Sequence, residues 1–142
     1  IVATGRGDFP NQVNNSVGFP GILKGALLVR ARKITDGMAI TAAHSIADFA
    51  EKRGITPDNI IANMSESEVF SIEAADVGTK AIEEGVARVH LSWQEIHDRA
   101  ARDIAAKHAT LKSLEDAGLI APPKMEEIQE ILQASIKQVT GA

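Results

Sequence analysis

The chain has 142 residues, of which 44% are hydrophobic and 24% charged, which suffices for one domain with its own core. A net charge of −4 and a pI near 5.5 argue against nucleic-acid binding, and the lack of cysteine excludes disulfides and zinc–thiolate sites. No apolar run is long enough to span a bilayer and the first residues do not resemble a secretory signal, so we expect a cytoplasmic location without membrane contact.

The first residues predict a buried strand that leads into a loop. Ile1 to Ala3 form a short apolar run, which ends at Thr4-Gly5. A strand this short needs partner strands, and the rest of the chain does not predict a sheet. We therefore expect the chain to be the C-terminal part of a longer polypeptide. The alternative is a chain whose start is only renumbered or disordered.

The loop that follows carries four side-chain amides in five positions: Asn11, Gln12, Asn14 and Asn15. Amides are costly to bury without partners, and they offer a donor and an acceptor without a charge. Such a cluster suits a loop that binds a small polar ligand at the carboxyl end of a strand in an α/β sheet. The alternative is a solvent-exposed loop with some local helix capping.

Helical patterns follow the loop, so the sequence predicts a mostly helical protein. We expect a short helical segment over 10–17, a helix over 20–33, and a helix that Thr35 caps and Gly54 ends. Another helix is expected from a cap at Ser71 to Gly85, and residues 86–91 are expected to be extended. The capping-box spacing of Ser92 and Glu95 begins the longest helix, to about residue 117, and a last helix follows the break at Pro122-Pro123.

Three further features suggest local roles. Arg6 and Asp8 are expected to form a local ion pair, and the four histidines lack the spacing of metal ligands. Trp93 at the start of the long helix either anchors that helix or belongs to an interface.

The order of residues in the first third is the most specific feature of the sequence. Residues 2–15 read VATGRGDFPNQVNN, followed by GFPGI at 18–22 and GAL at 25–27. This run closely resembles the bacterial and archaeal malic enzymes, which are NAD(P)-dependent, oxaloacetate-decarboxylating malate dehydrogenases. Gly7 departs from the family's usual serine and Leu28 from a common acidic residue. Beyond Gly54 the resemblance is mainly one of layout, and the last fifty residues carry little of it.

The resemblance implies an α/β fold: the C-terminal, mostly helical part of a Rossmann-like NAD(P)-binding domain, with one N-terminal strand and five to six helices. Residues 1–90 would end the cofactor domain, and residues 91–142 would form a helical extension. The resemblance also places Asn14 and Asn15 at the malate and nicotinamide pocket and Gly5 beside the cofactor. It does not decide which asparagine contacts malate.

The resemblance further implies oxidative decarboxylation of (S)-malate to pyruvate and CO₂, with reduction of NAD or NADP and a divalent Mg or Mn ion. The family's lysine base, tyrosine acid, metal ligands and glycine-rich phosphate loop lie before Ile1. We therefore predict no catalytic residue and no metal ligand in this segment, and no activity of the chain alone. Its partners would be the remaining polypeptide and, in a homodimer, a second copy. The alternatives are a non-catalytic interaction or regulatory module derived from a malic enzyme, and the same segment within a fusion.

Overall fold

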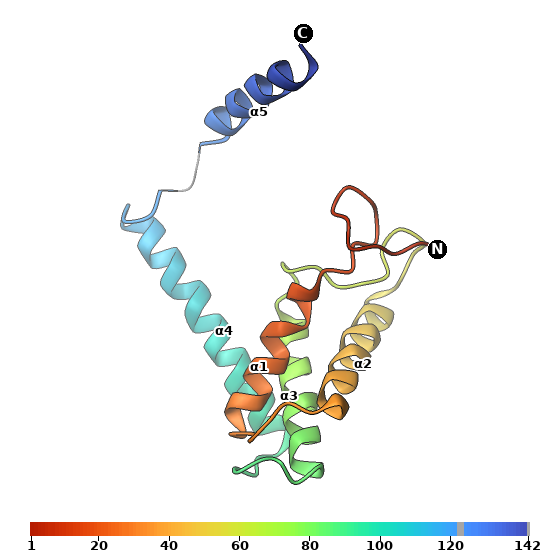
Figure 1. The fold of residues 1–142 in the computed structure, drawn as a ribbon. Coiled ribbons are helices and arrows are strands. Elements are labelled where there is room, and N and C mark those ends of the chain that lie inside the picture. Colours follow the sequence, from red (N-terminus) through yellow and green to blue (C-terminus); the bar gives the residue numbers. More distant parts are fainter. Residues whose placement is uncertain (122–123, 142) are drawn as a thin grey trace. The chain divides into compact units, whose positions relative to one another are not determined.

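A computed structural model describes residues 1–121 and 124–141 (Figure 1). A 3₁₀ helix, η1 (Asn15–Val17), is followed by five α-helices among these residues: α1 (Phe19–Leu28), α2 (Asp36–Arg53), α3 (Glu68–Glu83), α4 (Trp93–Asp116) and α5 (Met125–Thr140). The chain divides into two compact units, Ile1–Ala105 and Ala106–Ala142, and the boundary in the sequence falls within α4. This partition does not test where the cofactor domain ends, so the predicted division after residue 90 stays a prediction.

The predicted N-terminal strand is not confirmed, because the described part of the chain contains no strand. Ile1 and Val2 are 84% and 77% exposed. Thr4 forms only an isolated parallel bridge with Gln12, in which the backbone N–H of Val13 donates to the Thr4 carbonyl at 2.8 Å. A strand requires a neighbouring strand to pair its backbone, and none of the described residues supplies one.

Two helix starts lie where their local capping signals predict them. The hydroxyl of Thr35 accepts a hydrogen bond from the Met38 N–H at 3.2 Å, and α2 ends before Gly54, whose φ is +96°. At the start of α4, the Ser92 N–H donates to the Glu95 carboxylate at 2.8 Å, and the Glu95 N–H donates back to the Ser92 hydroxyl at 3.3 Å.

Two other predicted boundaries are wrong. Helix α3 begins at Glu68, and Ser71 lies inside it, where its hydroxyl donates to the Glu68 carbonyl at 2.9 Å. Helix α1 ends at Leu28 rather than near residue 33, because the chain turns at Arg30, which has a φ of +50°.

The connection over residues 86–91 contains no strand, although we expected an extended segment. The N–H groups of Arg88 and Val89 both donate to the Val29 carbonyl at 3.0 Å, so this connection is tied to the end of α1. The predicted break at Pro122-Pro123 lies outside the described residues.

Helix α3 is the centre of the first unit, since both α1 and α2 pack extensively against it. Small residues allow α1 and α3 to approach closely. A Cβ atom on Gly25 would lie 2.5 Å from the Ala74 carbonyl oxygen and 3.0 Å from the Gly78 nitrogen. The main core surrounds this crossing and consists of buried aliphatic side chains: Val29, Met38, Ala42, Ala75, Val77, Ala81, Ala87 and Ile96.

The first part of α4 belongs to the first unit. Ile96 is fully buried in the core, and the Trp93 indole N–H donates to Asp76 on α3 at 2.6 Å. Trp93 also stacks on the His97 ring, with 5.0 Å between the ring centroids. These contacts support the interpretation of Trp93 as an anchor for the start of α4.

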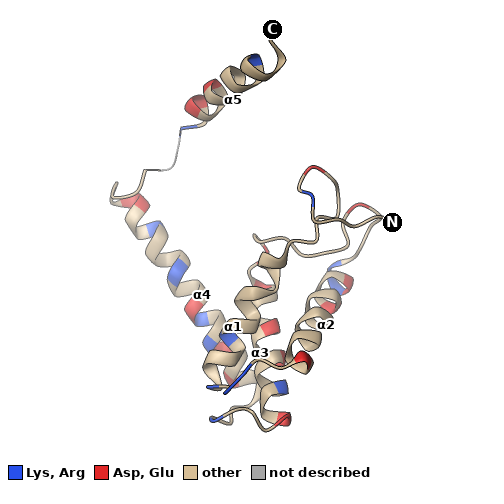
Figure 2. Cartoon of the chain, in the orientation of Figure 1, with Lys and Arg blue, Asp and Glu red and all other residues tan. Residues whose placement is uncertain are grey.

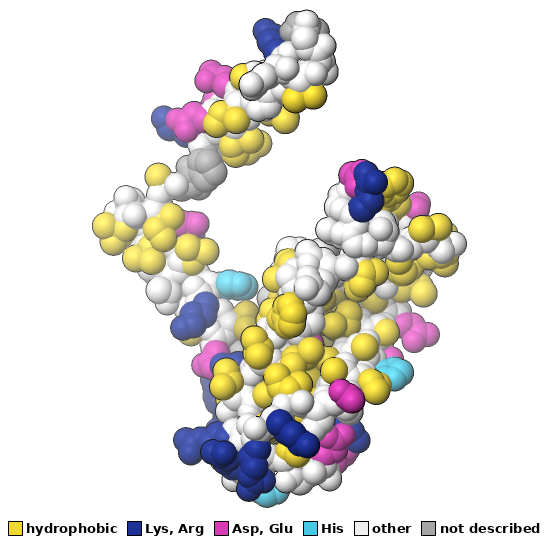
Figure 3. Space-filling view, in the orientation of Figure 1, with side chains coloured by type: hydrophobic (Ala, Val, Ile, Leu, Met, Phe, Trp, Pro, Cys, Tyr) yellow, Lys and Arg dark blue, Asp and Glu magenta, His cyan; other side chains and the backbone are white. Residues whose placement is uncertain are grey.

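The second unit exposes its apolar side chains. Helix α5 carries a row of them at helical spacing, visible in yellow in Figure 3: Met125, Ile128, Ile131, Leu132, Ile136 and Val139. No helix in the described residues combines the length and apolarity required to cross a membrane.

The α1–α3 crossing gives a first test. We expect Gly25→Ala to destabilise the protein that contains this chain by about 1–3 kcal/mol, because the added methyl meets backbone atoms that cannot move aside. Gly5→Ala is the matched control, since a Cβ there meets nothing within 4 Å. Thermal unfolding of both variants measures the effect, and an unchanged midpoint for Gly25→Ala would contradict the packing described here.

Candidate functional site

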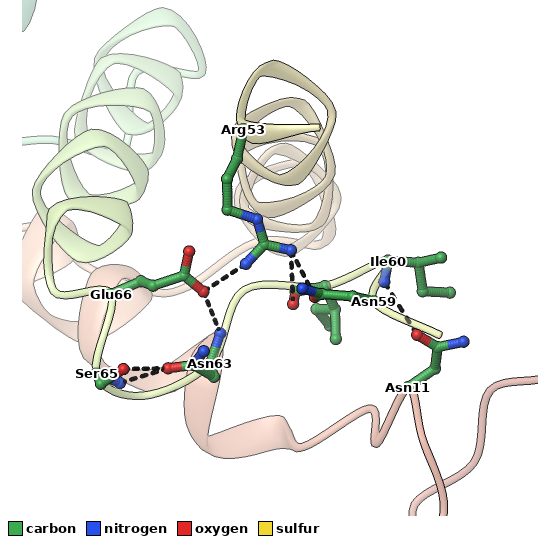
Figure 4. A network of polar contacts seen from close by, with 8 residues as sticks. Asn11, Arg53, Asn59, Ile60, Asn63, Ser65 and Glu66 are labelled. Carbon is green, nitrogen blue, oxygen red and sulfur yellow. Dashed lines mark hydrogen bonds and ion pairs between the residues drawn. The ribbon is translucent and has the colours of Figure 1, made fainter. Parts of the chain in front are cut away.

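The amide loop leads into η1 and then α1, and its first amide, Asn11, is structural. Its side chain is 6% exposed and its φ is +57°. The side-chain NH₂ donates to the Val2 carbonyl at 3.1 Å and to the Pro57 carbonyl at 2.6 Å, while the side-chain oxygen accepts from the Ile60 N–H at 3.0 Å. Asn11 therefore ties the amide loop to the connection between α2 and α3 (Figure 4).

The side-chain oxygen of Asn14 is engaged in a hydrogen bond within the loop. Its side-chain oxygen accepts from the Ser16 N–H at 3.0 Å and so caps η1, and its backbone carbonyl accepts from the Val17 N–H at 3.1 Å. The side chain is half-buried. Its NH₂ group is the part left for a ligand, so Asn14 can act as a donor without loss of the cap.

Asn15 is the amide best placed to bind a ligand. Its side chain is exposed and forms no hydrogen bond with any residue that the structure describes, so donor and acceptor are both available. Its backbone carbonyl accepts from the Gly18 N–H at 3.1 Å, which fixes the residue at the start of η1. The structure thus brings Asn14 and Asn15 together with different freedom to bind.

The remaining residues of the loop make local contacts. The Gln12 side chain donates to the Gly5 carbonyl at 3.3 Å, and the predicted role of Gly5 at the cofactor stays a prediction. Arg6 forms the expected ion pair with Asp8 at 2.5 Å and lies 5.0 Å from the centroid of the Phe9 ring. The hydrogen bond from Arg6 lowers the pKa of the Asp8 carboxyl.

The amide loop forms one wall of the candidate site, and the connection between α2 and α3 forms the second wall. Arg53, the last residue of α2, forms hydrogen bonds and an ion pair with residues of this second wall (Figure 4). The guanidinium donates to Glu66 at 2.5 Å and to the Asn59 side-chain oxygen at 2.7 Å. Glu66 also accepts from the Asn63 N–H at 2.9 Å. Hydrogen bonding to Arg53 holds the pKa of the Glu66 carboxyl below its ordinary value.

Two hollows meet at Asn14. A polar hollow of about 270 Å³ lies between the amide loop and the second wall, and its polar lining includes Asn11, Gln12, Asn14, Asp58, Asn59 and Asn63. An apolar hollow of about 350 Å³ lies on the other side, lined by Asn14 and Asn15 and by side chains of η1, α1 and α2.

The segment that carries the amide pair contains no charged residue. No Lys, Arg, Asp or Glu occurs between Phe9 and Leu23, so η1 and the first turns of α1 are tan in Figure 2. Arg53 is engaged by Glu66, and Asp58 is the one charged residue lining the polar hollow. The arrangement can bind and orient a polar ligand through neutral hydrogen bonds.

The structure does not bring together a metal site in the residues it describes, because no three His, Asp or Glu side chains gather there.

Comparison with known proteins shows the family of the chain. Residues 2–82 match the family described as "Malic enzyme, NAD binding domain". The bifunctional malic/malolactic enzyme of Bacillus subtilis is 40% identical over 99 residues, which cover 70% of this chain and 24% of that protein.

Two solved structures match the fold. The malic enzyme of Entamoeba histolytica matches with a TM-score of 0.92 and 59% identity, over 99% of this chain and 29% of that one. The malic enzyme of Pyrococcus horikoshii matches with a TM-score of 0.75 and 42% identity, over 82% of this chain and 27% of that one.

The chain belongs to the malic enzyme NAD-binding domain family, as its amide loop predicts, and it has the fold of that domain. It spans about a quarter of the length of the Bacillus relative.

Sequence reasoning missed the structural role of Asn11 and the second wall. The partners of Asn11 include Pro57 and Ile60, which lie more than forty residues away in the sequence. The only available signal was the amide content of the connection at Asn59 and Asn63.

Asn11 gives a second test. We expect Asn11→Gly to weaken the tie between the two loops by about 1–3 kcal/mol, because glycine keeps the positive φ but removes three hydrogen bonds. Amide hydrogen exchange at Ile60 should accelerate, whereas Asn15→Ala should leave it unchanged. Equal protection of Ile60 in the Asn11 variant would show that the tie is not structural.

Proposed function

We propose that this chain is part of a longer malic enzyme that oxidises and decarboxylates (S)-malate to pyruvate and CO₂ while it reduces NAD or NADP. Membership of the family supports this proposal, as do relatives named as NADP-dependent and NAD-dependent malic enzymes. Asn14 and Asn15 contribute the amide groups of the malate and nicotinamide pocket, and Gly5 lies beside the cofactor.

The observation that carries the proposal is the free amide of Asn15 next to the half-free amide of Asn14. An amide donates to a carboxylate oxygen of malate, or pairs with the carboxamide of nicotinamide, and does not change its charge over the working pH range. The rigid start of η1 holds both groups at fixed positions, which favours a defined orientation of the ligand. In this chain their role is to bind and orient.

The chemistry of proton transfer and the metal ion belong to other parts of the proposed enzyme. Residues of those parts would hold a divalent ion, Mg or Mn, which would supply Lewis-acid chemistry at the C2 oxygen of malate. The proposed enzyme is cytoplasmic, and a homodimer is its proposed assembly. The exposed apolar row on α5 is compatible with burial against further protein. The competing function, a non-catalytic interaction module, makes no use of the free Asn15 amide.

The amide pair can be tested in the intact enzyme. We expect Asn15→Ala to lower kcat/KM for malate by roughly 10- to 100-fold, because hydrogen bonds to a charged ligand are lost. Asn14→Ala should lower it as well and also loosen η1, since its cap disappears. Gln133→Ala on the exposed surface of α5 is the control. Unchanged malate kinetics in both asparagine variants would remove the site assignment.

The isolated 142-residue chain provides a separate test. It should show no malate-dependent reduction of NAD or NADP, measured as absorbance of the reduced cofactor in the presence of Mg²⁺ or Mn²⁺. The described residues form no metal site, and the chain contains no tyrosine to serve as the family's acid. Turnover by this chain alone would contradict the assignment of the catalytic groups to other parts of the enzyme.

A further inference from the structure

Glu73 on α3 is the one charged side chain in the described part of the chain that is fully buried. It has 0% exposure, and neither carboxylate oxygen forms a hydrogen bond of ordinary geometry with the described residues. Burial of a carboxyl group without a strong partner opposes folding. A polar group in this position therefore requires a physical explanation.

The carboxyl of Glu73 lies against the first turn of α1. A Cβ atom on Gly21 would overlap the Glu73 side chain, and one on Gly18 would lie 3.9 Å from its Oε1 atom. The first N–H groups of a helix lack partners within the helix and carry partial positive charge. The N–H groups of Gly21 and Ile22 lower the pKa of the Glu73 carboxyl, so this side chain of α3 interacts favourably with the start of α1.

The same turn of α1 is continuous with the amide pair. The Gly18 N–H donates to the Asn15 carbonyl at 3.1 Å, and the Ile22 N–H donates to the Gly18 carbonyl at 3.2 Å. A displacement of the α1 start therefore moves η1, and with it the side chains of Asn14 and Asn15. Glu73 does not touch the hollows beside these asparagines, so any effect on a ligand there is indirect.

We propose that Glu73 is a positioning residue for malate binding: its buried carboxyl holds the first turn of α1, and this turn sets the orientation of the Asn14 and Asn15 amides. This inference rests on the proposed function of the amide pair. It adds a residue that the ligand does not contact.

The protonation state of Glu73 makes this role measurable. Burial raises the pKa of its carboxyl to about 8, the N–H groups of Gly21 and Ile22 oppose this rise, and the charge of Asp76 adds to it. Because the folded pKa lies above the ordinary value of 4.5, the stabilising contribution of the protonated carboxyl is full below that value and is lost as pH rises to about 8. The cost of desolvating the charge outweighs its attraction to the two N–H groups, so ionisation disfavours the packed position of this side chain against α1. Other titratable groups on the surrounding helices are exposed or paired: Lys24, His44, Asp48 and Asp103.

The test compares Glu73→Gln with the unmodified enzyme, using the intact protein. The neutral amide keeps the shape of the protonated carboxyl and cannot ionise. The measured quantity is the ratio of kcat/KM for malate in the variant to kcat/KM in the unmodified enzyme. We expect this ratio to rise about fivefold between about pH 7 and 9.5, because only the unmodified enzyme ionises at residue 73. The KM for the cofactor should change less than the KM for malate. Glu68→Gln, an exposed glutamate on the same helix, is the control and should give a constant ratio.

A ratio that does not depend on pH would overturn the positioning role, provided that Asn15→Ala impairs malate use. If Asn15→Ala has no effect, the proposed function itself fails, so the two failures are distinguishable. A second measurement needs no variant: amide exchange over residues 15–22 of the unmodified enzyme, corrected for intrinsic pH dependence, should accelerate above about pH 8. Exchange without such an acceleration would likewise overturn the proposal.

Discussion

The close approach of α1 to α3 is the constraint on which the first unit depends. Gly25 allows the α1 backbone to lie against the backbone of α3 at Ala74 and Gly78, and Gly78 in turn leaves room for Val29 and Ile96. A side chain at these glycines would separate the two helices and open the core around Met38 and Val77. The position of α1 then determines where η1 and the amide loop begin.

The amide loop shows how one residue type serves three purposes. Long-range hydrogen bonds engage the whole side-chain amide of Asn11, and a local cap engages the oxygen of Asn14. The Asn15 side chain forms no hydrogen bond with the residues that the structure describes. The loop can therefore be rigid and still present unsatisfied amide groups at its surface. Capping and an available amide group therefore occur in adjacent residues, so the two alternatives that composition left open are compatible, and ligand binding by the loop stays a prediction.

Local signals in the sequence predicted the parts of the fold that depend on neighbours in the chain. Three such signals involve only residues within one helical turn, so they can be recognised in the sequence. They are the N-cap at Thr35, the helix end at Gly54 and the capping box of Ser92 and Glu95. Ser71 misled the prediction for α3, because the same hydroxyl can cap a helix or bond within one. The strand predicted at Ile1 to Ala3 is not confirmed, and a local pattern could not establish it, since a strand exists only through its partners.

The residues of the candidate site also fall into two groups, those indicated by the order of the sequence and those whose roles depend on distant partners. The prediction for Asn14 and Asn15 comes from the resemblance of their loop to a known family, and the structure adds that their side chains differ in their hydrogen bonds. The roles of Asn11 and Arg53 depend on partners brought near by folding, and the role proposed for Glu73 depends on the glycine at position 21. Charge and amide content alone do not contain this information.

The most direct measurement of the central claim is a crystal structure of the intact enzyme with malate and cofactor bound. The account predicts an oxygen of malate at hydrogen-bond distance, about 3 Å, from the Asn15 side-chain amide, with Asn14 still capping η1. Malate bound elsewhere, with the Asn15 amide directed to solvent or packed against other protein, would contradict it.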